Sequence, residues 1–331
     1  MKAVMYTEYG SPEVLHVKDI AQPVPKDDQI LVKIHAVHIN FGDLLARNFK
    51  AVTPRKFSMP AILWLPARLA FGMNRPRKGI LGSEYAGEVV SVGKSVTRFT
   101  VGDSVFGYRG PNMGANVEYL CVTETEVVAH KPQNTTYEEA AALPYGAITA
   151  MGLLKKANIQ PGQRVLINGA SGGIGSAALQ LAKHYGAHVT AVCGTPRIGF
   201  VKALGADKVI DYSKQDFTRN GETYDLIVDV LGKSSFGRCK RSLNPNGRYL
   251  MASFKMKHVL QMLWTSRFGS KKVICVMVAE SQAVLLEVKA LAEAGTLKSI
   301  IDRRYPLEQA AAAHRYVEAG GKTGSVVLTM A

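Results

Sequence analysis

The chain has 331 residues, of which 47% are hydrophobic and 20% charged, and Lys and Arg outnumber Asp and Glu by 41 to 26. This composition excludes a disordered chain, and the length allows two domains with separate cores. The net charge of +15 attracts polyanions of many kinds, including NADPH, CoA esters, anionic lipids and nucleic acids, and does not choose among them.

The N-terminal sequence and the cysteine spacing narrow the class of protein further. The N-terminal sequence MKAVMYTEYG carries charge and has no long apolar core, so we expect neither a signal peptide nor a membrane anchor, and a cytoplasmic location. The cysteines at 121, 193, 239 and 275 are far apart and form no C-x-x-C pair. This spacing argues against a structural zinc site and against a disulfide framework.

The N-terminal third predicts short antiparallel strands. Residues 1–38 alternate with period two between Pro- and Gly-rich turns, and a short helix is predicted over 44–49, with Asp43 near its start. Further strands with glycines at their turns are predicted over three ranges, 80–105, 117–122 and 127–130.

The segment 57–73 interrupts this β-rich part. It is apolar, broken by Pro60 and Pro66, and too short to span a bilayer. Its basic flanking residues are Arg55, Lys56, Arg75, Arg77 and Lys78. Three interpretations stay open: a lid over a substrate pocket, a peripheral membrane contact, or a plain surface insertion.

From residue 137 onward, helical and strand patterns alternate. An Ala-rich helical stretch over 137–154, interrupted at Pro144, leads to a strand at 164. The later predicted strands lie at 208–211, 225–229, 248–252, 273–279, 300–305 and 325–329, with helices at 282–294 and 307–317 and a basic, Trp-containing connection at 255–272. This alternation predicts an α/β fold with a doubly wound parallel sheet.

The clearest motif is a strand, glycine turn and helix over 163–183. The turn comprises Gly169, Ala170, Ser171, Gly172, Gly173, Ile174 and Gly175. It departs from G-x-G-x-x-G, since Ala170 holds the first position, but a second strand at 188–193 follows at the spacing of a βαβ unit. The glycines let the backbone approach a pyrophosphate, which the helix N-terminus stabilises. We therefore predict a dinucleotide site.

The end of the second strand bears on cofactor choice. An NAD site places Asp or Glu there, whereas this chain has Gly194, Thr195, Pro196 and Arg197. A hydroxyl and a guanidinium suit a 2′-phosphate, so NADPH is favoured. The alternative is an ordinary helix start with a solvated Arg197.

Several stretches together resemble the medium-chain dehydrogenase/reductase superfamily over essentially the whole chain. They are GSPEVL at 10–15, INFGD at 39–43, ILGSEYAGEVVSVG at 80–93, VGDSVFG at 101–107, AALPYGAITA at 141–150, GASGGIG at 169–175, LGADKVIDY at 204–212 and HRYVEAGGKTGSVVLT at 314–329. The resemblance implies a β-rich GroES-like catalytic domain over 1–123 and 281–331 and a Rossmann domain binding NADP(H) over 124–280.

Within that superfamily the chain is similar to the zinc-free quinone oxidoreductase branch, including its plastid-envelope and bacterial members. Asn40 stands where zinc alcohol dehydrogenases carry a catalytic Cys, and Ser83 stands where they carry His before Glu84. The resemblance therefore implies that no catalytic metal is bound, and that quinones or activated C=C bonds are reduced with NADPH. The insertion at 50–78 leaves the substrate open.

The resemblance also implies a site in the cleft between the domains. Asn40 would orient nicotinamide or the substrate oxygen, with turn capping as the alternative, and Tyr145 would donate a proton, with core packing as the alternative. Further residues expected to contact the cofactor are Asp43, Thr149, Tyr212, Asp229 and Leu231. For Tyr212, plain packing is the alternative to a contact with the 2′-phosphate or adenine.

The expected partners are a small-molecule quinone, enone or enal and a second copy of the chain in a homodimer, with no nucleic acid. An NAD(P)-dependent alcohol dehydrogenase or carbonyl reductase is one alternative function. A redox-silent protein that uses the nucleotide fold to bind RNA or a membrane surface is another, and the charge of +15 is compatible with it.

Overall fold

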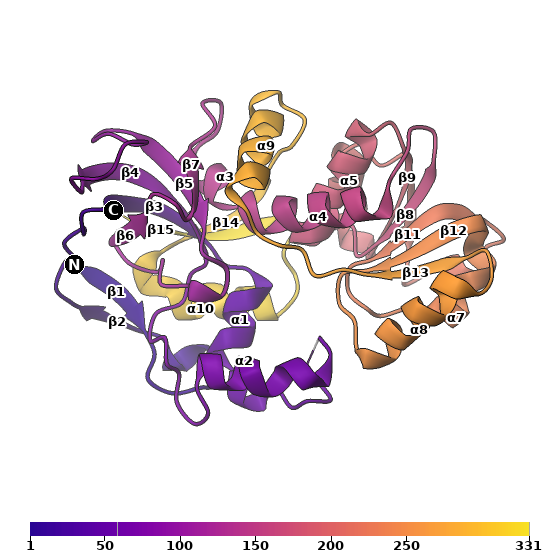
Figure 1. Cartoon of the computed structure of the whole chain (residues 1–331), viewed down its shortest axis with the longest axis horizontal. Helices are drawn as coiled ribbons and strands as arrows, with labels where there is room; N and C mark the ends of the chain where they lie inside the picture. Colours follow the sequence, from indigo (N-terminus) through magenta and orange to yellow (C-terminus); the bar gives the residue numbers. More distant parts are fainter. Residues whose placement is uncertain (58, 331) are drawn as a thin grey trace. The chain divides into compact units, whose positions relative to one another are not determined.

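In the computed structural model, the described residues, 1–57 and 59–330, form two compact units (Figure 1). The first consists of Met1–Thr53, Leu65–Tyr145 and the residues from Glu280 onward, and the second of Pro54–Trp64 and Gly146–Ala279. The fold is α/β, with an antiparallel-rich GroES-like unit and a parallel Rossmann-like unit, as the sequence predicts.

These units divide the chain at different places from the predicted domains. Residues 124–145 lie in the first unit rather than with 146–280, because β7 (Val127–His130) pairs with β5 (Ser104–Tyr108) in one sheet. Residues 54–64 lie in the second unit, where the Lys255 ammonium donates a 2.7 Å hydrogen bond to the Arg55 carbonyl. Strand pairing and long-range contacts therefore decide the division.

The first unit is built on a sheet in the order β14-β15-β3-β4-β5-β7, with β6 also paired to β3. Its strands are β3 (Gln29–His38), β4 (Glu84–Val92), β5, β6 (Tyr119–Thr123), β7, β14 (Ile301–Pro306) and β15 (Ser325–Thr329), and β1 (Lys2–Met5) pairs with β2 (His16–Asp19) separately. Its helices include α1 (Phe41–Arg47), α3 (Tyr137–Ala141), α9 (Gln282–Glu293) and α10 (Ala310–Glu318). Alternate residues of β3, such as Ile30, Val32 and Ile34, enter one core.

The second unit holds a parallel sheet in the order β10-β9-β8-β11-β12-β13, which confirms the doubly wound prediction. The strands are β8 (Arg164–Asn168), β9 (His188–Cys193), β10 (Lys208–Asp211), β11 (Tyr224–Asp229), β12 (Leu243–Met251) and β13 (Lys272–Cys275). The helices are α4 (Pro144–Ala157), α5 (Gly173–His184), α6 (Ile198–Ala203), α7 (Phe236–Cys239) and α8 (Met256–Arg267). The strand order reverses between β8 and β11, where ligands of such sheets bind.

Several predicted elements need correction. The stretch 255–272, expected as a connection, contains the helix α8, and the strand expected over 273–279 ends at Cys275. The helix expected over 44–49 begins at Phe41, since Asn40 caps it. The helical stretch over 137–154 is interrupted before Pro144, as predicted, and Pro144 starts α4 because the first helical position needs no N–H donor.

The segment 57–73 forms the helix α2 (Trp64–Phe71) and packs more closely than expected. Phe57 is buried, the Phe71 ring stacks 5.0 Å from that of Phe49, and the Tyr9 hydroxyl donates to the Phe71 carbonyl. The large apolar side chains that stay exposed are Ile62, Leu65, Leu69 and Met73. Among the described residues, no helix has the length and apolar character needed to cross a bilayer.

A buried guanidinium ties α1 to α10 in the first unit. Arg47 is 1% exposed; it donates to His314 Nδ1 at 2.9 Å and to the Gly10 carbonyl, and it pairs with Glu318. Burial and the adjacent guanidinium lower the pKa of His314 from 6.5 to about 3. The imidazole is therefore neutral at physiological pH and accepts the hydrogen bond.

This shift predicts a defined acid sensitivity. Between pH 6.5 and about 3, His314 is protonated in the unfolded chain but neutral in the native state. The stability that comes from keeping His314 neutral is therefore fully present above pH 6.5 and is lost as the pH falls from 6.5 to about 3. We expect the free energy of unfolding to fall there with a component of up to about 1.4 kcal/mol per pH unit. His314→Gln keeps an acceptor for Arg47 and should lack this component in urea titrations. The exposed control His16→Gln should keep it; equal slopes in both variants would contradict the assignment.

Candidate functional site

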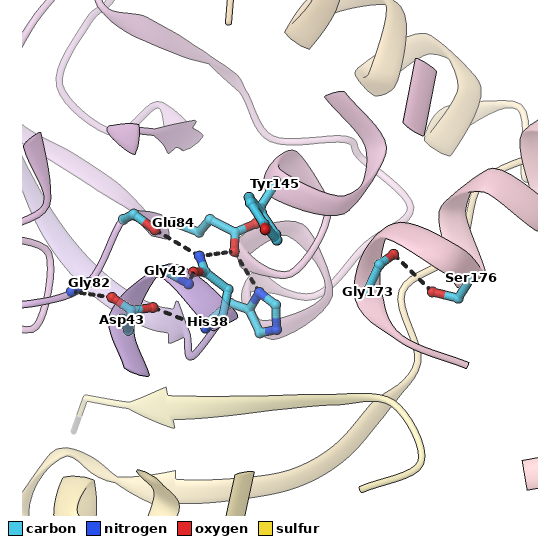
Figure 2. Close-up of polar contacts among 10 residues, drawn as sticks. His38, Gly42, Asp43, Gly82, Glu84, Tyr145, Gly173 and Ser176 are labelled. Atoms are coloured by element: carbon cyan, nitrogen blue, oxygen red, sulfur yellow. Dashed lines mark hydrogen bonds and ion pairs between the residues drawn. The ribbon is translucent and has the colours of Figure 1, made fainter. Parts of the chain in front are cut away.

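A buried polar cluster lies in the first unit where β3 ends and β4 begins (Figure 2). Asn40 is the N-cap of α1: its Oδ1 accepts from the Gly42 amide at 2.7 Å. Its Nδ2 donates to Ser83 Oγ at 2.7 Å and to Glu84 Oε2 at 2.8 Å. The amide is thus used within the protein, as the turn-capping alternative expects, and its N–H groups already have acceptors.

Glu84 is the centre of this cluster, and it was not among the predicted site residues. Its carboxylate is completely buried, and it accepts from His38 Nδ1 at 2.6 Å and from the Tyr145 amide at 2.7 Å, besides Asn40. His38 and Glu84 are paired positions of β3 and β4. Polar residues at the ends of two predicted strands were the available signal, but the pairing of those strands was not readable.

Asp43 also acts inside the protein. Its Oδ2 accepts from the Asn40 amide at 3.0 Å and its Oδ1 from the Gly82 amide at 2.9 Å, while the side chain is 1% exposed. Burial, with the charge of the nearby Glu84, raises the pKa of Asp43 to about 6 against the opposite effect of the hydrogen bonds from the Asn40 and Gly82 amides. Asp43 therefore links α1 to the loop before β4, and its contact with the cofactor stays a prediction.

Tyr145 stands at the start of α4, where its amide binds Glu84 (Figure 2). The side chain is partly buried, and its ring lies 6.1 Å from that of Tyr108. Burial, with the charges of Glu84 and Asp43, raises the pKa of Tyr145 to about 12. The phenol therefore stays protonated at neutral pH and can donate a hydrogen bond.

This cluster does not fit a catalytic zinc ion. Zinc prefers thiolate and imidazole ligands, whereas the amide of Asn40 and the hydroxyl of Ser83 bind each other. Within residues 1–57 and 59–330, no group of three or more His, Cys, Asp or Glu side chains is arranged to hold a metal. The donor set, rather than an empty position, argues against zinc.

In the second unit, the glycine turn leads from β8 into α5 with the close approaches that a pyrophosphate cradle needs. Gly169 has a φ of +90°, and a Cβ on Gly175 would lie 2.1 Å from the Gly169 carbonyl oxygen. Gly172 is the N-cap of α5 and offers no side chain to the first amides. The turn also contains Ala170 and Ser171, and the first two residues of α5 are Gly173 and Ile174. These features fit a nucleotide phosphate at the helix N-terminus.

Neighbouring elements support the cradle. A Cβ on Gly146 would come within 2.6 Å of the Gly173 carbonyl, so α4, which carries Thr149, packs against the turn. Leu231 is 53% exposed and lies beside Gly169. Leu231 is therefore near the turn, and Thr149 lies on the helix that packs against the turn.

Asp229 is not at this surface. It is fully buried at the end of β11, where it accepts from Asn168 Nδ2 at 3.0 Å, from the Tyr249 hydroxyl at 2.7 Å and from the Ser234 amide at 3.0 Å. Its carboxylate orders the loop after β11 that presents Leu231. The protein itself supplies the donors to this carboxylate, and a contact of Asp229 with the cofactor stays a prediction.

Beside the end of β9 lies an acid of the neighbouring strand that sequence reasoning missed. Asp211, at the end of the neighbouring β10, accepts from Thr195 Oγ1 at 2.5 Å and from the hydroxyl and amide of Ser213 at 2.7 and 3.0 Å. Hydrogen bonds from Thr195 and Ser213 lower the pKa of Asp211. Parallel strands end at one edge of a sheet, so the Asp of LGADKVIDY was a usable signal.

The other predicted residues of this region lie in the segment after β9 and at Tyr212, after β10. Arg197 ends the 3₁₀ helix Thr195–Arg197, which follows Gly194 directly. The Tyr212 hydroxyl would lie 3.1 Å from a Cβ on Gly194, and its ring is 61% exposed. An exposed ring next to a glycine backbone is a surface for stacking rather than core packing.

Comparison with known proteins shows which family the chain belongs to. The alcohol dehydrogenase GroES-like domain family matches residues 26–133, and the zinc-binding dehydrogenase family matches 204–328. The 2-methylene-furan-3-one reductase of Solanum lycopersicum is 32% identical over 99% of this chain and 79% of the relative. The chloroplastic quinone-oxidoreductase homolog of Spinacia oleracea is 30% identical over 99% and 98%.

Solved structures agree. The quinone oxidoreductase from Coxiella burnetii matches with a TM-score of 0.84 at 27% identity, covering 99% of both chains. An NAD-dependent alcohol dehydrogenase matches with a TM-score of 0.82 at 28% identity over the full length of both. The family resemblance seen in the sequence is thus confirmed, and the chain belongs to the medium-chain dehydrogenase/reductase superfamily as an oxidoreductase related to the quinone oxidoreductases.

Proposed function

We propose that this enzyme transfers hydride from NADPH, without zinc, to quinones or to the activated C=C bonds of α,β-unsaturated carbonyl compounds. The observation that carries the proposal is the donor set of Asn40, Ser83 and Glu84, which satisfies itself and offers no ligands for a Lewis-acidic metal. An unactivated alcohol needs such a metal to lower its pKa, whereas a quinone or enone accepts hydride without one.

Relatives support this substrate class. The NADPH-dependent alkenal/one oxidoreductase of Arabidopsis thaliana is 30% identical over 99% of this chain and 79% of the relative. When bound, NADPH supplies the hydride. The residues proposed to hold it are the turn 169–175 for the pyrophosphate, Gly194, Thr195, Arg197 and Tyr212 for the phosphorylated ribose, and Thr149 and Leu231 beside the turn.

The preference for NADPH over NADH rests on Arg197. Asp211 brings a carboxylate close to Thr195, but the hydroxyls of Thr195 and Ser213 and the Ser213 amide already donate to its oxygens. The Arg197 guanidinium carries the charge opposite to that of a 2′-phosphate, and Tyr212 offers a ring for stacking.

Tyr145 is the proposed catalytic side chain of the first unit. A pKa of about 12 makes its phenol a poor proton source at neutral pH but a stable hydrogen-bond donor. Its proposed role is to donate to the substrate carbonyl oxygen, where negative charge grows as hydride arrives, while water supplies the proton. Asn40 and Glu84 position the start of α4 through the Tyr145 amide.

The alternatives are separated by simple assays. NADPH oxidation with 9,10-phenanthrenequinone, 2-alkenals and enones supports the proposal; turnover of simple secondary alcohols with NAD(P)⁺ would favour an alcohol dehydrogenase. Failure with every acceptor would favour a redox-silent binding protein. A homodimer and a cytoplasmic location complete the proposal, and light scattering tests the first of these.

The cofactor preference predicts the effect of Arg197→Ala. Loss of a charge-assisted contact of about 1.5–3 kcal/mol should raise the KM for NADPH by about tenfold or more. The KM for NADH should hardly change. Lys202→Ala removes another cation of the same region, on α6, and serves as the control. Equal KM values for both cofactors in the unsubstituted enzyme would overturn the preference.

The role of Tyr145 predicts a kcat effect without a cofactor effect. Tyr145→Phe keeps the ring and the amide that binds Glu84, and should lower kcat for an enone by about 10²-fold. The KM for NADPH should stay within about twofold, since the loss acts in the transition state. Tyr119→Phe, on β6, is the matched control. Unchanged kcat in Tyr145→Phe would assign this residue to packing.

The donor set predicts metal independence. Elemental analysis of the dialysed enzyme should find no stoichiometric zinc, and a chelator should leave quinone reduction unchanged. Stoichiometric zinc together with activity lost to the chelator would contradict the assignment.

A further inference from the structure

Helix α8 of the second unit has apolar side chains on opposite faces, and the sheet uses one of them. Val259 and Met262 pack on the core, and Thr265 Oγ1 accepts from the Val273 amide of β13 at 3.0 Å. The outward face has no such partner among the described residues. Its exposed members are Met256 at 43%, Leu260 at 61%, Leu263 at 57%, Trp264 at 58% and Phe268 at 60%.

The spacing of these residues makes them one continuous surface. Positions 256, 260, 263, 264 and 268 follow helical periodicity along α8 into the residue after it, and the rings of Trp264 and Phe268 lie 6.0 Å apart. Beside them is a hollow of about 200 Å³ lined by Phe236, Trp264 and Phe268 together with Lys240 and Lys271. A contiguous exposed apolar face of this kind marks an interaction site.

The stretch of chain that contains α8 carries charge of one sign. Residues 230–279 contain ten Lys and Arg and no Asp or Glu, so this stretch carries two thirds of the net charge of +15. Lys255, Lys257 and Arg267 are exposed on or beside the helix. The Lys272 ammonium caps the end of α8 by donating to the Thr265 and Gly269 carbonyls at 2.7 and 3.0 Å. The Lys255 and Lys271 ammonium groups each donate one 2.7 Å hydrogen bond, to the Arg55 and Lys240 carbonyls.

We propose that α8 docks on the surface of an anionic lipid bilayer. Its outward apolar side chains enter the boundary between headgroups and acyl chains, with Trp264 at the level where indole rings are most stable, and the surrounding ammonium and guanidinium groups bind lipid phosphates and carboxylates. The surface is distinct from the segment 57–73 and does not depend on the proposed reaction.

A second copy of the chain fits this face less well. A two-fold contact places the same patch on both sides, so the exposed Lys255, Lys257 and Arg267 of one chain would face the same cations of the other. An anionic bilayer meets the same residues with opposite charge. Charge complementarity thus selects the lipid surface.

The two tryptophans of the chain, Trp64 and Trp264, allow a direct test. In the variant Trp64→Phe, the tryptophan fluorescence comes from Trp264 alone. This emission should shift to shorter wavelength when vesicles of phosphatidylserine and phosphatidylcholine are added. Brominated lipids should quench it. In Trp264→Phe, Trp64 should show neither effect. Vesicles of phosphatidylcholine alone should bind weakly, and about 1 M salt, where the Debye length is about 3 Å, should weaken the anionic binding.

Sedimentation with the same vesicles tests the face itself. Leu263→Ser with Trp264→Ser should reduce the bound fraction at least about tenfold, since each buried large side chain contributes a factor of that order. The control Val24→Ser with Val101→Ser changes exposed apolar residues of the first unit, 85% and 62% exposed, and should bind normally. Quinone reduction in both variants reports folding and stays independent of the lipid result.

Three outcomes would overturn the proposal. One is a shift and quenching confined to Trp64, which would assign the contact to segment 57–73. Another is sedimentation unaffected by the α8 substitutions. The last is a Trp264 emission that is already at short wavelength without vesicles and moves to longer wavelength on dilution, together with a dimer, seen by light scattering, that the α8 substitutions dissociate. This result would assign the face to a second copy of the chain.

Discussion

The buried carboxylate of Glu84 is the interaction on which the polar cluster depends. It joins the end of β3 through His38, the cap of α1 through Asn40 and the start of α4 through the Tyr145 amide. A buried carboxylate is tolerated only when donors surround it, and here each donor comes from a different element. Removing any one of them would leave a desolvated charge, so the elements are fixed together, and the position of Tyr145 with them.

The same principle recurs in the second unit, where the buried carboxylate of Asp229 orders the loop after β11. Beside it, the cradle is defined by close backbone approach rather than by side chains, since Gly169 and Gly175 touch across the turn. A dinucleotide would thus meet backbone amides and the helix N-terminus, while the choice between phosphorylated and free ribose falls to the side chains after β9.

The excess of positive charge is unevenly distributed along the chain, and it can serve both cofactor binding and lipid binding. A positive field favours anionic cofactors in general, and the acid-free stretch 230–279, which contains the apolar helix α8, carries two thirds of the net charge. An enzyme whose hydride acceptor is dissolved in a bilayer would gain from binding both the anionic cofactor and the anionic lipid surface. In such an enzyme the apolar acceptor would reach the protein from the same surface that α8 contacts.

The sequence by itself determined what depends on local patterns. Period-two runs, β-branched strands and the glycine turn at 169–175 predicted the parallel sheet and the nucleotide cradle, because backbone conformation and chain direction are local properties. The apolar pattern of 255–272 was ambiguous, since apolar residues on both faces of a helix leave no clear periodicity.

Only the tertiary structure decided how side chains are used. Asn40, Asp43 and Asp229 looked like cofactor contacts, yet each is satisfied by donors or acceptors distant in sequence, which no local pattern reveals. Asp211 meets Thr195 because β9 and β10 are neighbours in the sheet, and Glu84 meets His38 because β3 and β4 are paired. Strand pairing sets these distances, and pairing is a property of the folded chain.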